Sequence, residues 1–600
     1  MLFYTNNPQK IEKTTFCTCI VRPYHIYFSM AHFHIKKKKG RPYLYVREIA
    51  RINGKPKVVS QIYIGSPERI AELARKQSPS TDFKVKAESY GALWLASQIS
   101  RDIDIAGIID EVIPRRKKET GPSVGEYFLY CIWNRMIHAV SKNKLADWYK
   151  TTAIQQIRPV EISELTSQRY WEKWNRVSEN KLNEISRRFF EKLREVETPD
   201  SDCLLFDTTN YYTFMASDTA SELAVRGKNK AGRHNLRQIG LGLLVARYSR
   251  LPLYYRIYPG NMHDSRLFRS IMDEMFGVVC GFHKTKERLT VIFDKGMNAE
   301  QNYEWIDEHR RIHFITNYST CFSEELVMVP LSNFEVVDTA KNRLLVEKDK
   351  PEDCMLAYRT SNEYWGKERS VIVTYNPATA RKQNYTFDSK LDVLREELLT
   401  MRRKVREREP HWREPDKVRE RYFRLCERLH ISSDFYSVET SSHSMSFTRN
   451  VYRVEQKRKC FGKNIIITDN TDWSTAEIVE ANLDRREVEN RFRLSKNDEF
   501  VSVSPLRHWT DSKIRCHLFS CVVSLTLLRR IELHLLKAGI RKSSEEVMED
   551  MNNLHSVLFL KDGRSAPKRK LEVPTKTQRE VLTAFGYEID SSGVLQPLPR

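Results

Sequence analysis

Two short apolar segments of the chain each end in an aspartate. Residues 204–206 (Leu-Leu-Phe) precede Asp207, and residues 291–293 (Val-Ile-Phe) precede Asp294. Side chains at the carboxyl ends of neighbouring parallel strands converge on one place. Adjacent carboxylates repel each other unless a cation neutralises them, and Mg²⁺ prefers such hard oxygen ligands. The pair therefore predicts a divalent-cation site, although a single strand-end aspartate more often only starts a turn.

A helix predicted from Ser474 to about Lys496 adds a third acid. Ser474-Thr-Ala-Glu477 has the spacing of a capping box, which begins the helix. Arg485, Glu489 and Lys496 fall within roughly 40° of one another around a helix axis. One face thus presents a cation, an acid and a cation, which suits a site for phosphate and metal. A salt-bridged surface helix explains the same spacing equally well.

The composition favours a polyanion as partner. The 600 residues include 100 Lys and Arg against 78 Asp and Glu, a net charge of +22. This surplus favours nucleic acid first and an anionic membrane second. No apolar run is long enough to span a membrane, and residues 1–29 lack a secretory signal pattern. The 11 cysteines include no CxxC pair, which indicates reduced thiols in a cytoplasmic protein without a zinc module.

Strand-like and helix-like runs alternate between residues 203 and 317, which predicts an α/β core. A β-rich and helical insertion interrupts this core, and a β-hairpin and a mostly helical region precede it. The predicted boundaries are 1–29 for a poorly ordered extension, 30–84 for a β-rich segment, 85–200 for a helical region suited to binding DNA ends, 201–318 for the first part of the core, 319–470 for the insertion, 471–540 for the second part of the core and 541–600 for a C-terminal tail.

Two basic stretches leave their role open. Pro410 and Pro415 divide a charged helical stretch at 390–430, in which apolar residues step by three and four: Leu391, Leu394, Leu398, Met401 and Val405. The second stretch is a loop that follows the DNA backbone or is simply solvated, with equal weight for each. Its residues are Arg226, Lys228, Lys230, Arg233 and Arg237.

The acidic residues and their surroundings resemble a known family. Asp207, Asp294 and Glu489 look like the DDE triad of insertion-sequence transposases of the IS-four-like class. That family carries a signature Tyr-x2-Arg-x3-Glu-x6-Lys around its glutamate; Arg485 and Lys496 match it, whereas Asn482 stands at the tyrosine position. Residues 294–296 (Asp-Lys-Gly), 258–264 (Tyr-Pro-Gly-Asn-Met-His-Asp) and 508–510 (His-Trp-Thr) are also similar. The resemblance runs from about residue 40 to 590 and is most specific between 203 and 517.

The resemblance implies a ribonuclease-H-like core that holds two Mg²⁺ ions, with Mn²⁺ able to substitute, on Asp207, Asp294 and Glu489. It implies cleavage of double-stranded DNA at terminal inverted repeats, strand transfer into target DNA, and a homodimer in the DNA complex of a prokaryotic, nucleoid-associated protein. Arg485 and Lys496 would then bind phosphate. An inactive or repurposed DNA-binding protein and a general metal-dependent nuclease remain as alternatives. The Asn482 departure puts details of end binding, or a hairpin step, in doubt.

Overall fold

The structure is a computed structural model of the 600-residue chain. It describes residues 30–599 apart from gaps at 39–40, 53–54, 69, 71, 73–82, 200–201, 216–218, 228–234, 263–267, 269–270, 273, 275–287, 498, 504–505, 507 and 562–567. The chain forms two compact units: Met1–Ala87 with Val557–Arg569, and Glu88–Ser556 with Lys570–Arg600. Each unit is described by itself. No helix among these residues is long and apolar enough to cross a membrane.

The first unit contains a three-stranded antiparallel sheet in the order β1-β2-β3. Its strands are β1 (Met30–Lys38), β2 (Arg41–Ile52) and β3 (Lys55–Gly65). Residues 53–54 between the last two strands lie outside the described residues, as do residues 1–29 of the predicted extension. A second small sheet has the order β18-β17-β4, with β4 (Phe83–Ser89), β17 (His555–Lys561) and β18 (Lys568–Leu571).

The second unit begins with a helical region built around one long apolar helix. That helix, α18 (Asp511–Lys537), is buried on nearly every side. The surrounding helices include α2 (Gly91–Ser100), α3 (Ile105–Val112), α4 (Val124–Ile137), α5 (Lys142–Tyr149), α7 (Ser167–Trp174), α8 (Glu179–Glu197), α19 (Ser544–Asn552) and α20 (Lys576–Ala584). Ser123 and Glu126 form a capping box that begins α4. The aromatic residues of α4 lie in this core.

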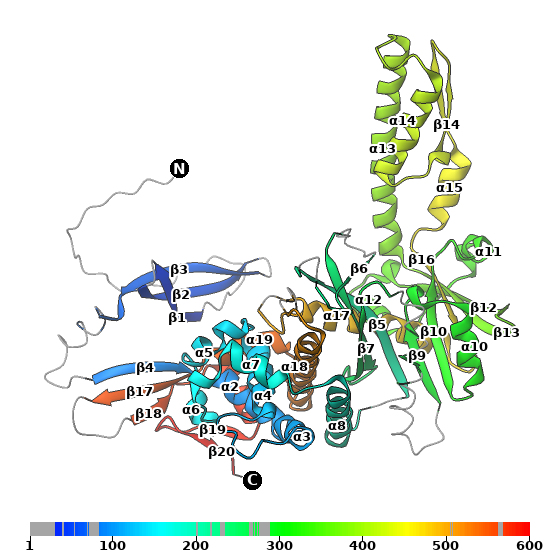
Figure 1. The fold of residues 1–600 in the computed structure, drawn as a ribbon. Coiled ribbons are helices and arrows are strands. Elements are labelled where there is room, and N and C mark those ends of the chain that lie inside the picture. Colours follow the sequence, from blue (N-terminus) through cyan, green and yellow to red (C-terminus); the bar gives the residue numbers. More distant parts are fainter. Residues whose placement is uncertain are drawn as a thin grey trace, which may run out of the picture. The chain divides into compact units, whose positions relative to one another are not determined.

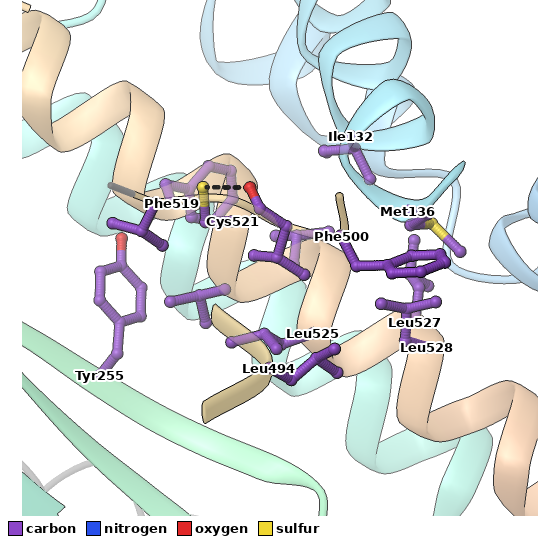
Figure 2. Close-up of a cluster of buried hydrophobic side chains, with 14 of the residues drawn as sticks. Ile132, Met136, Tyr255, Leu494, Phe500, Phe519, Cys521, Leu525, Leu527 and Leu528 are labelled. Carbon is purple, nitrogen blue, oxygen red and sulfur yellow. Dashed lines mark hydrogen bonds between the residues drawn. The ribbon is translucent and has the colours of Figure 1, made fainter. Parts of the chain in front are cut away.

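The same core reaches the rest of the second unit. In Figure 2, Phe519 and Leu525 of α18 lie in one cluster with Tyr255 and Leu494, which come from a strand and a helix outside the helical region. Burial of such side chains contributes roughly 1.5–3 kcal/mol each. The helical region therefore fixes the helix that carries Leu494, which is also the helix that carries Glu489.

A ten-stranded mixed sheet forms the centre of the second unit. Its order is β11-β12-β13-β16-β10-β9-β5-β7-β6, with β8 also paired to β7. The pairs β5–β9 and β9–β10 are parallel and the others are antiparallel. The strands are β5 (Cys203–Thr213), β6 (Val225–Arg226), β7 (Arg237–Ala246), β8 (Pro252–Pro259), β9 (Leu289–Phe293), β10 (Ile312–Tyr318), β11 (Glu335–Val336), β12 (Leu356–Tyr364), β13 (Lys367–Tyr375) and β16 (Lys463–Thr468).

The sheet is covered on both faces, so the fold is mixed α/β. Alternate residues of β5 and β9 enter two different cores, because successive strand residues point to opposite faces. Leu205 and Ile292 pack with α17 and α18, whereas Phe206 and Phe293 pack on the other side with α10 (Glu300–Glu308). At Gly240 of β7 a Cβ would lie 2.1 Å from the Tyr258 ring, so only glycine fits there.

Part of the segment predicted as an insertion belongs to this sheet, since β11, β12, β13 and β16 extend it. The remainder forms an arm with its own small core, in which the two helices and the hairpin lie side by side (Figure 1). The arm contains α13 (Pro377–Arg406), α14 (Pro415–Leu429), β14 (Tyr436–Thr440), β15 (Met445–Arg449) and α15 (Val451–Lys459). The apolar residues that step along 391–405 are all buried in it, and Pro415 begins α14.

The helix predicted from Ser474 to Lys496 is divided into two. Its parts are α16 (Thr475–Asp484) and α17 (Arg486–Ser495), which meet at Arg485. Ser474 and Glu477 form the predicted capping box. The backbone amide of Arg485 donates to the carbonyl of Leu483, which interrupts the regular helical hydrogen bonding. The single-helix prediction was therefore wrong at this point, and the interruption lies within the candidate site.

Candidate active site

Asp207 and Asp294 lie level with each other on two parallel strands, Asp207 within β5 and Asp294 directly after β9. The prediction that the first strand ends at Asp207 was wrong, because β5 continues to Thr213 and pairs with β7 as far as that residue. Leu205 of β5 pairs with Ile292 of β9, so the register continued by two residues sets Asp207 beside Asp294. Side chains two residues apart on a strand share a face. Both aspartates therefore point to the side on which Leu205 and Ile292 pack against α17. The same strand register therefore sets Leu205 beside Ile292 in the apolar core and Asp207 beside Asp294 next to that core.

Glu489 comes to the same place from α17. Val488, its neighbour, is buried in the core beneath the sheet, which leaves Glu489 at the edge of that core. The Glu489 side chain is 54% exposed, against 23% for Asp294. The glutamate thus sits on the outer rim of the acidic group and has room to move.

The other two carboxylates affect the pKa of Asp207. Burial is the largest cause that raises the pKa of Asp207, to about 6, and the charges of Asp294 and Glu489 raise it further. The Thr208 amide donates to Asp207 Oδ1 at 2.8 Å, and this bond and Arg485 both act in the opposite direction. Three acids and one cation are therefore brought together beside the middle of β5 and the carboxyl end of β9.

Arg485 neutralises part of this negative charge. Its Nη1 lies 3.2 Å from Asp294 Oδ1 and 3.7 Å from Glu489 Oε1. The side chains of Arg485 and Asp294 are only 17% and 23% exposed, so this pair is better shielded from water than a surface ion pair, whereas Glu489 is largely exposed. The position of Arg485, where α16 meets α17, directs its guanidinium between the two acids.

The donor set fits a divalent cation, since all three groups offer carboxylate oxygens. Among the residues that the structure describes, however, no group of three or more His, Cys, Asp or Glu side chains is close enough to hold a metal ion. The guanidinium between Asp294 and Glu489 accounts for this spacing. A metal held by Asp207, Asp294 and Glu489 requires Arg485 to leave and the exposed Glu489 to move inward.

Lys496 is held on the next part of the same strand face. Its Nζ donates to Thr209 Oγ1 at 2.7 Å and lies 5.7 Å from the centre of the Tyr211 ring. Thr209 and Tyr211 are two and four residues beyond Asp207, so they share its face. Thr209, which Lys496 contacts, therefore lies about 7 Å along the strand from Asp207.

The predicted basic loop is described only at its two ends. Arg226 is exposed on β6 and pairs in register with Arg237, the first residue of β7. Arg237 Nη1 donates to the Ala224 carbonyl at 2.8 Å, so its position is fixed by the backbone. Lys228, Lys230 and Arg233 lie outside the described residues. The structure thus places two of the five cations at the edge of the sheet beside β7.

A polar cavity of about 440 Å³ opens next to the acids, and sequence reasoning did not find it. Amide side chains from several segments line it with Asp294 and Arg485; they are Asn317, Asn376, Gln383, Asn464 and Asn482. Asn482 Oδ1 is buried and accepts no hydrogen bond from a described residue. Amides offer both a donor and an acceptor. No spacing rule could have revealed the group, because its members come from separate segments.

No protein-family model and no curated protein matches the chain. Among solved structures, the chain is similar to a piggyBac transposase in a cryo-EM structure of its synaptic complex with hairpin DNA. The TM-score is 0.35 and the sequence identity 9%, over 78% of this chain and 82% of that one. A TM-score of this size assigns neither a family nor a function. The resemblance to IS-four-like transposases therefore stays a prediction.

Proposed function

We propose that this protein is a DNA transposase that cleaves double-stranded DNA at terminal inverted repeats and joins the ends to target DNA. The observation that carries the proposal is the convergence of Asp207, Asp294 and Glu489 with Arg485 between them. Three acids gathered in one place are costly unless they have a cation to bind. The +22 net charge of the chain supports a polyanionic substrate.

The strand order supports a ribonuclease-H-like interpretation of the core. Three antiparallel strands, β8, β7 and β5, are followed across the sheet by β9 and β10, both parallel to β5. In this interpretation the first and fourth strands carry the aspartates, and a later helix supplies the glutamate. The arm and the added strands lie in the chain between the second aspartate and the glutamate.

The residues of the site have separate roles in this proposal. Asp207, Asp294 and Glu489 would hold two Mg²⁺ ions, which when bound polarise the scissile phosphate and activate the attacking water or 3′-hydroxyl. Arg485, once displaced from the acids, and Lys496 would bind the phosphates on either side. Tyr211 is no nucleophile here, because its buried hydroxyl lies 2.5 Å from Ser495 Oγ. DNA ends must be paired before transfer, so we expect a homodimer on DNA.

The test is cleavage of a labelled duplex that carries the repeats flanking the gene, with Mg²⁺ or Mn²⁺ and with EDTA. We expect cuts at the repeat boundary and joined products for the unaltered protein, and none for Asp294→Ala. Asp338→Asn is the matched control, because Asp338 is an exposed acid whose side chain pairs with Arg343. Cleavage that persists in Asp294→Ala would refute the proposed site.

One observation favours a second function, a DNA-binding protein that does not cut. Arg485 already neutralises Asp294 and Glu489 without any metal, so the acids have a structural role that needs no catalysis. This alternative predicts specific binding to the repeats with no strand scission in Mg²⁺ or Mn²⁺. A metal-dependent nuclease would instead give free ends without joined products and with little sequence preference.

A further inference from the structure

A second cavity lies at the root of the arm and is separate from the acids. Its volume is about 590 Å³, within the range of sites that take a nucleotide-sized ligand. It is formed by the first turns of α13, the end of α14, the segment before β14, and the end of α15. The residues that line it are Thr379, Lys382, Gln383, Thr386, Phe387, Lys390, His430, Ile431, Ser432, Phe435, Lys457 and Phe461.

The charge of this cavity has one sign. Lys382, Lys390, Lys457 and His430 line it, and no Asp or Glu does. Among the described residues, none of the three lysines takes part in an ion pair. This differs from the arm as a whole, where cations such as Arg458 and Arg424 bind neighbouring acids. Uncompensated lysines around a hollow are suited to an anion.

The floor of the cavity is aromatic. Phe387 and Phe435 are buried and their rings meet edge to face at 5.1 Å, and Phe387 meets Phe461 in the same way at 5.3 Å. Phe461 is only partly buried, and an accessible aromatic ring is suited to stacking with a nucleobase of any sequence. The lysines and this ring match the phosphate and the base of a nucleotide.

The lysine cavity adjoins the cavity beside Asp294. Thr379 and Gln383 line both, and with Lys382, Thr386 and Lys390 they lie along one face of α13. Gly462 contacts this part of α13, because its amide donates to Gln383 Oε1 at 2.7 Å. A Cβ at Gly462 would lie 2.6 Å from the Asn376 carbonyl oxygen. A nucleic-acid strand that extends from the acids along this face of α13 would therefore reach the lysines directly.

We propose that this cavity binds single-stranded nucleotides next to the phosphate that reacts, with backbone phosphates on Lys382, Lys390 and Lys457 and a base against the phenylalanines. The proposal deepens the proposed function and rests on it, since it assumes a DNA strand at the acids. A duplex is too wide for a cavity of this volume, so the occupant is an unpaired segment. Stacking makes the binding tolerant of base sequence.

The test measures binding of the full chain to a fluorescent forked duplex with a single-stranded tail, in EDTA so that no cutting occurs. The variant is Lys382→Gln with Lys457→Gln, and the control is Arg453→Gln with Lys459→Gln. The control pair removes the same charge from exposed positions of α15 that do not line the cavity. Two lost phosphate contacts should weaken the dependence of log Kd on log salt by about 1.4 for a single strand.

We expect the cavity variant to lose the preference for forked over blunt DNA, with its affinity for blunt duplex unchanged and the control variant like the unaltered protein. A tail that carries 5-iododeoxyuridine should crosslink to Phe461, the partly exposed phenylalanine of the cavity. Equal loss in both variants, or crosslinks only elsewhere, overturns the cavity proposal and leaves the transposase proposal standing. Binding to neither DNA overturns both. The cavity proposal is also overturned if a free nucleoside monophosphate protects Lys382, Lys390 and Lys457 from acetylation while the forked DNA does not.

Discussion

Replacing Asp207 by asparagine should stabilise the protein and, under the proposed function, abolish DNA cleavage. Burial and the neighbouring acids raise the pKa of Asp207 from 3.8 to about 6. The folded protein therefore binds more protons than the unfolded chain between these values, and stability falls as pH rises through this range. Two pKa units correspond to about 3 kcal/mol at 1.36 kcal/mol each. The loss is complete above pH 6 and absent below pH 4.

Asparagine keeps the shape of the side chain without the charge, so it removes this loss of folding stability at high pH. The assay is the melting temperature of both proteins from pH 4 to 8 in EDTA. The difference between them should be near zero at pH 4 and reach a few degrees in favour of Asp207→Asn at pH 7, since 1 kcal/mol shifts Tm by roughly 2–4 °C in domains smaller than this one. Mg²⁺ should then raise the Tm of the unaltered protein alone.

The control is Asp338→Asn, because Arg343 lowers the pKa of that exposed acid and its removal brings no gain at pH 7. A Tm difference between Asp207→Asn and the unaltered protein that does not change from pH 4 to 8 would falsify the reasoning. So would a lower Tm for Asp207→Asn at pH 7. Either result means that Asp207 is well solvated or that Arg485 compensates it fully. The acids would then have no need of a metal.

Three further results are expected. Arg485→Ala should increase Mn²⁺ affinity about tenfold without DNA, measured by electron paramagnetic resonance, because no cation then opposes the metal; weaker binding would mean that Arg485 organises the acids. Lys496→Met should reduce the salt dependence of duplex binding by about 0.9, one phosphate contact, and an unchanged slope would exclude that contact. His517 has a pKa well below 6.5 because of burial, Lys142 and Arg135. Stability should therefore fall as pH drops below 6.5, and His517→Gln should reduce that fall in Tm.

The acidic positions were open to prediction because their information is local. Each apolar run predicted a strand, and the two aspartates become neighbours once their strands are parallel, although β5 continues past Asp207 to Thr213. The spacing of Arg485 and Glu489 predicted that they share a helix face, and their side chains do meet. The helix interruption at Arg485 was not predictable, because no proline, glycine or charge pattern marks it. The metal role itself remains a prediction.

The contribution of the insertion to the sheet could not be read from the sequence. β13 pairs with β16 across the whole arm, so the partner strands are nearly 90 residues apart. Strand propensity identifies each run but not its partner. The two cavities were hidden for the same reason, since their lining residues come from segments that only the tertiary fold brings together. The sequence therefore predicted the charged residues of the site but not the two cavities beside them.

The cavities also give a physical meaning to the departure at residue 482. A tyrosine there would add an aromatic ring, whereas Asn482 keeps the wall of the cavity polar and directs a buried acceptor that no described donor reaches. A buried acceptor without a partner costs about 1–3 kcal/mol, so a ligand that donates to it recovers that free energy. Arg485 beside it is held by acids that a metal would compete for. In the proposed function, DNA and metal bound together would supply a donor to Asn482 Oδ1 and replace Arg485 as the cation beside the acids.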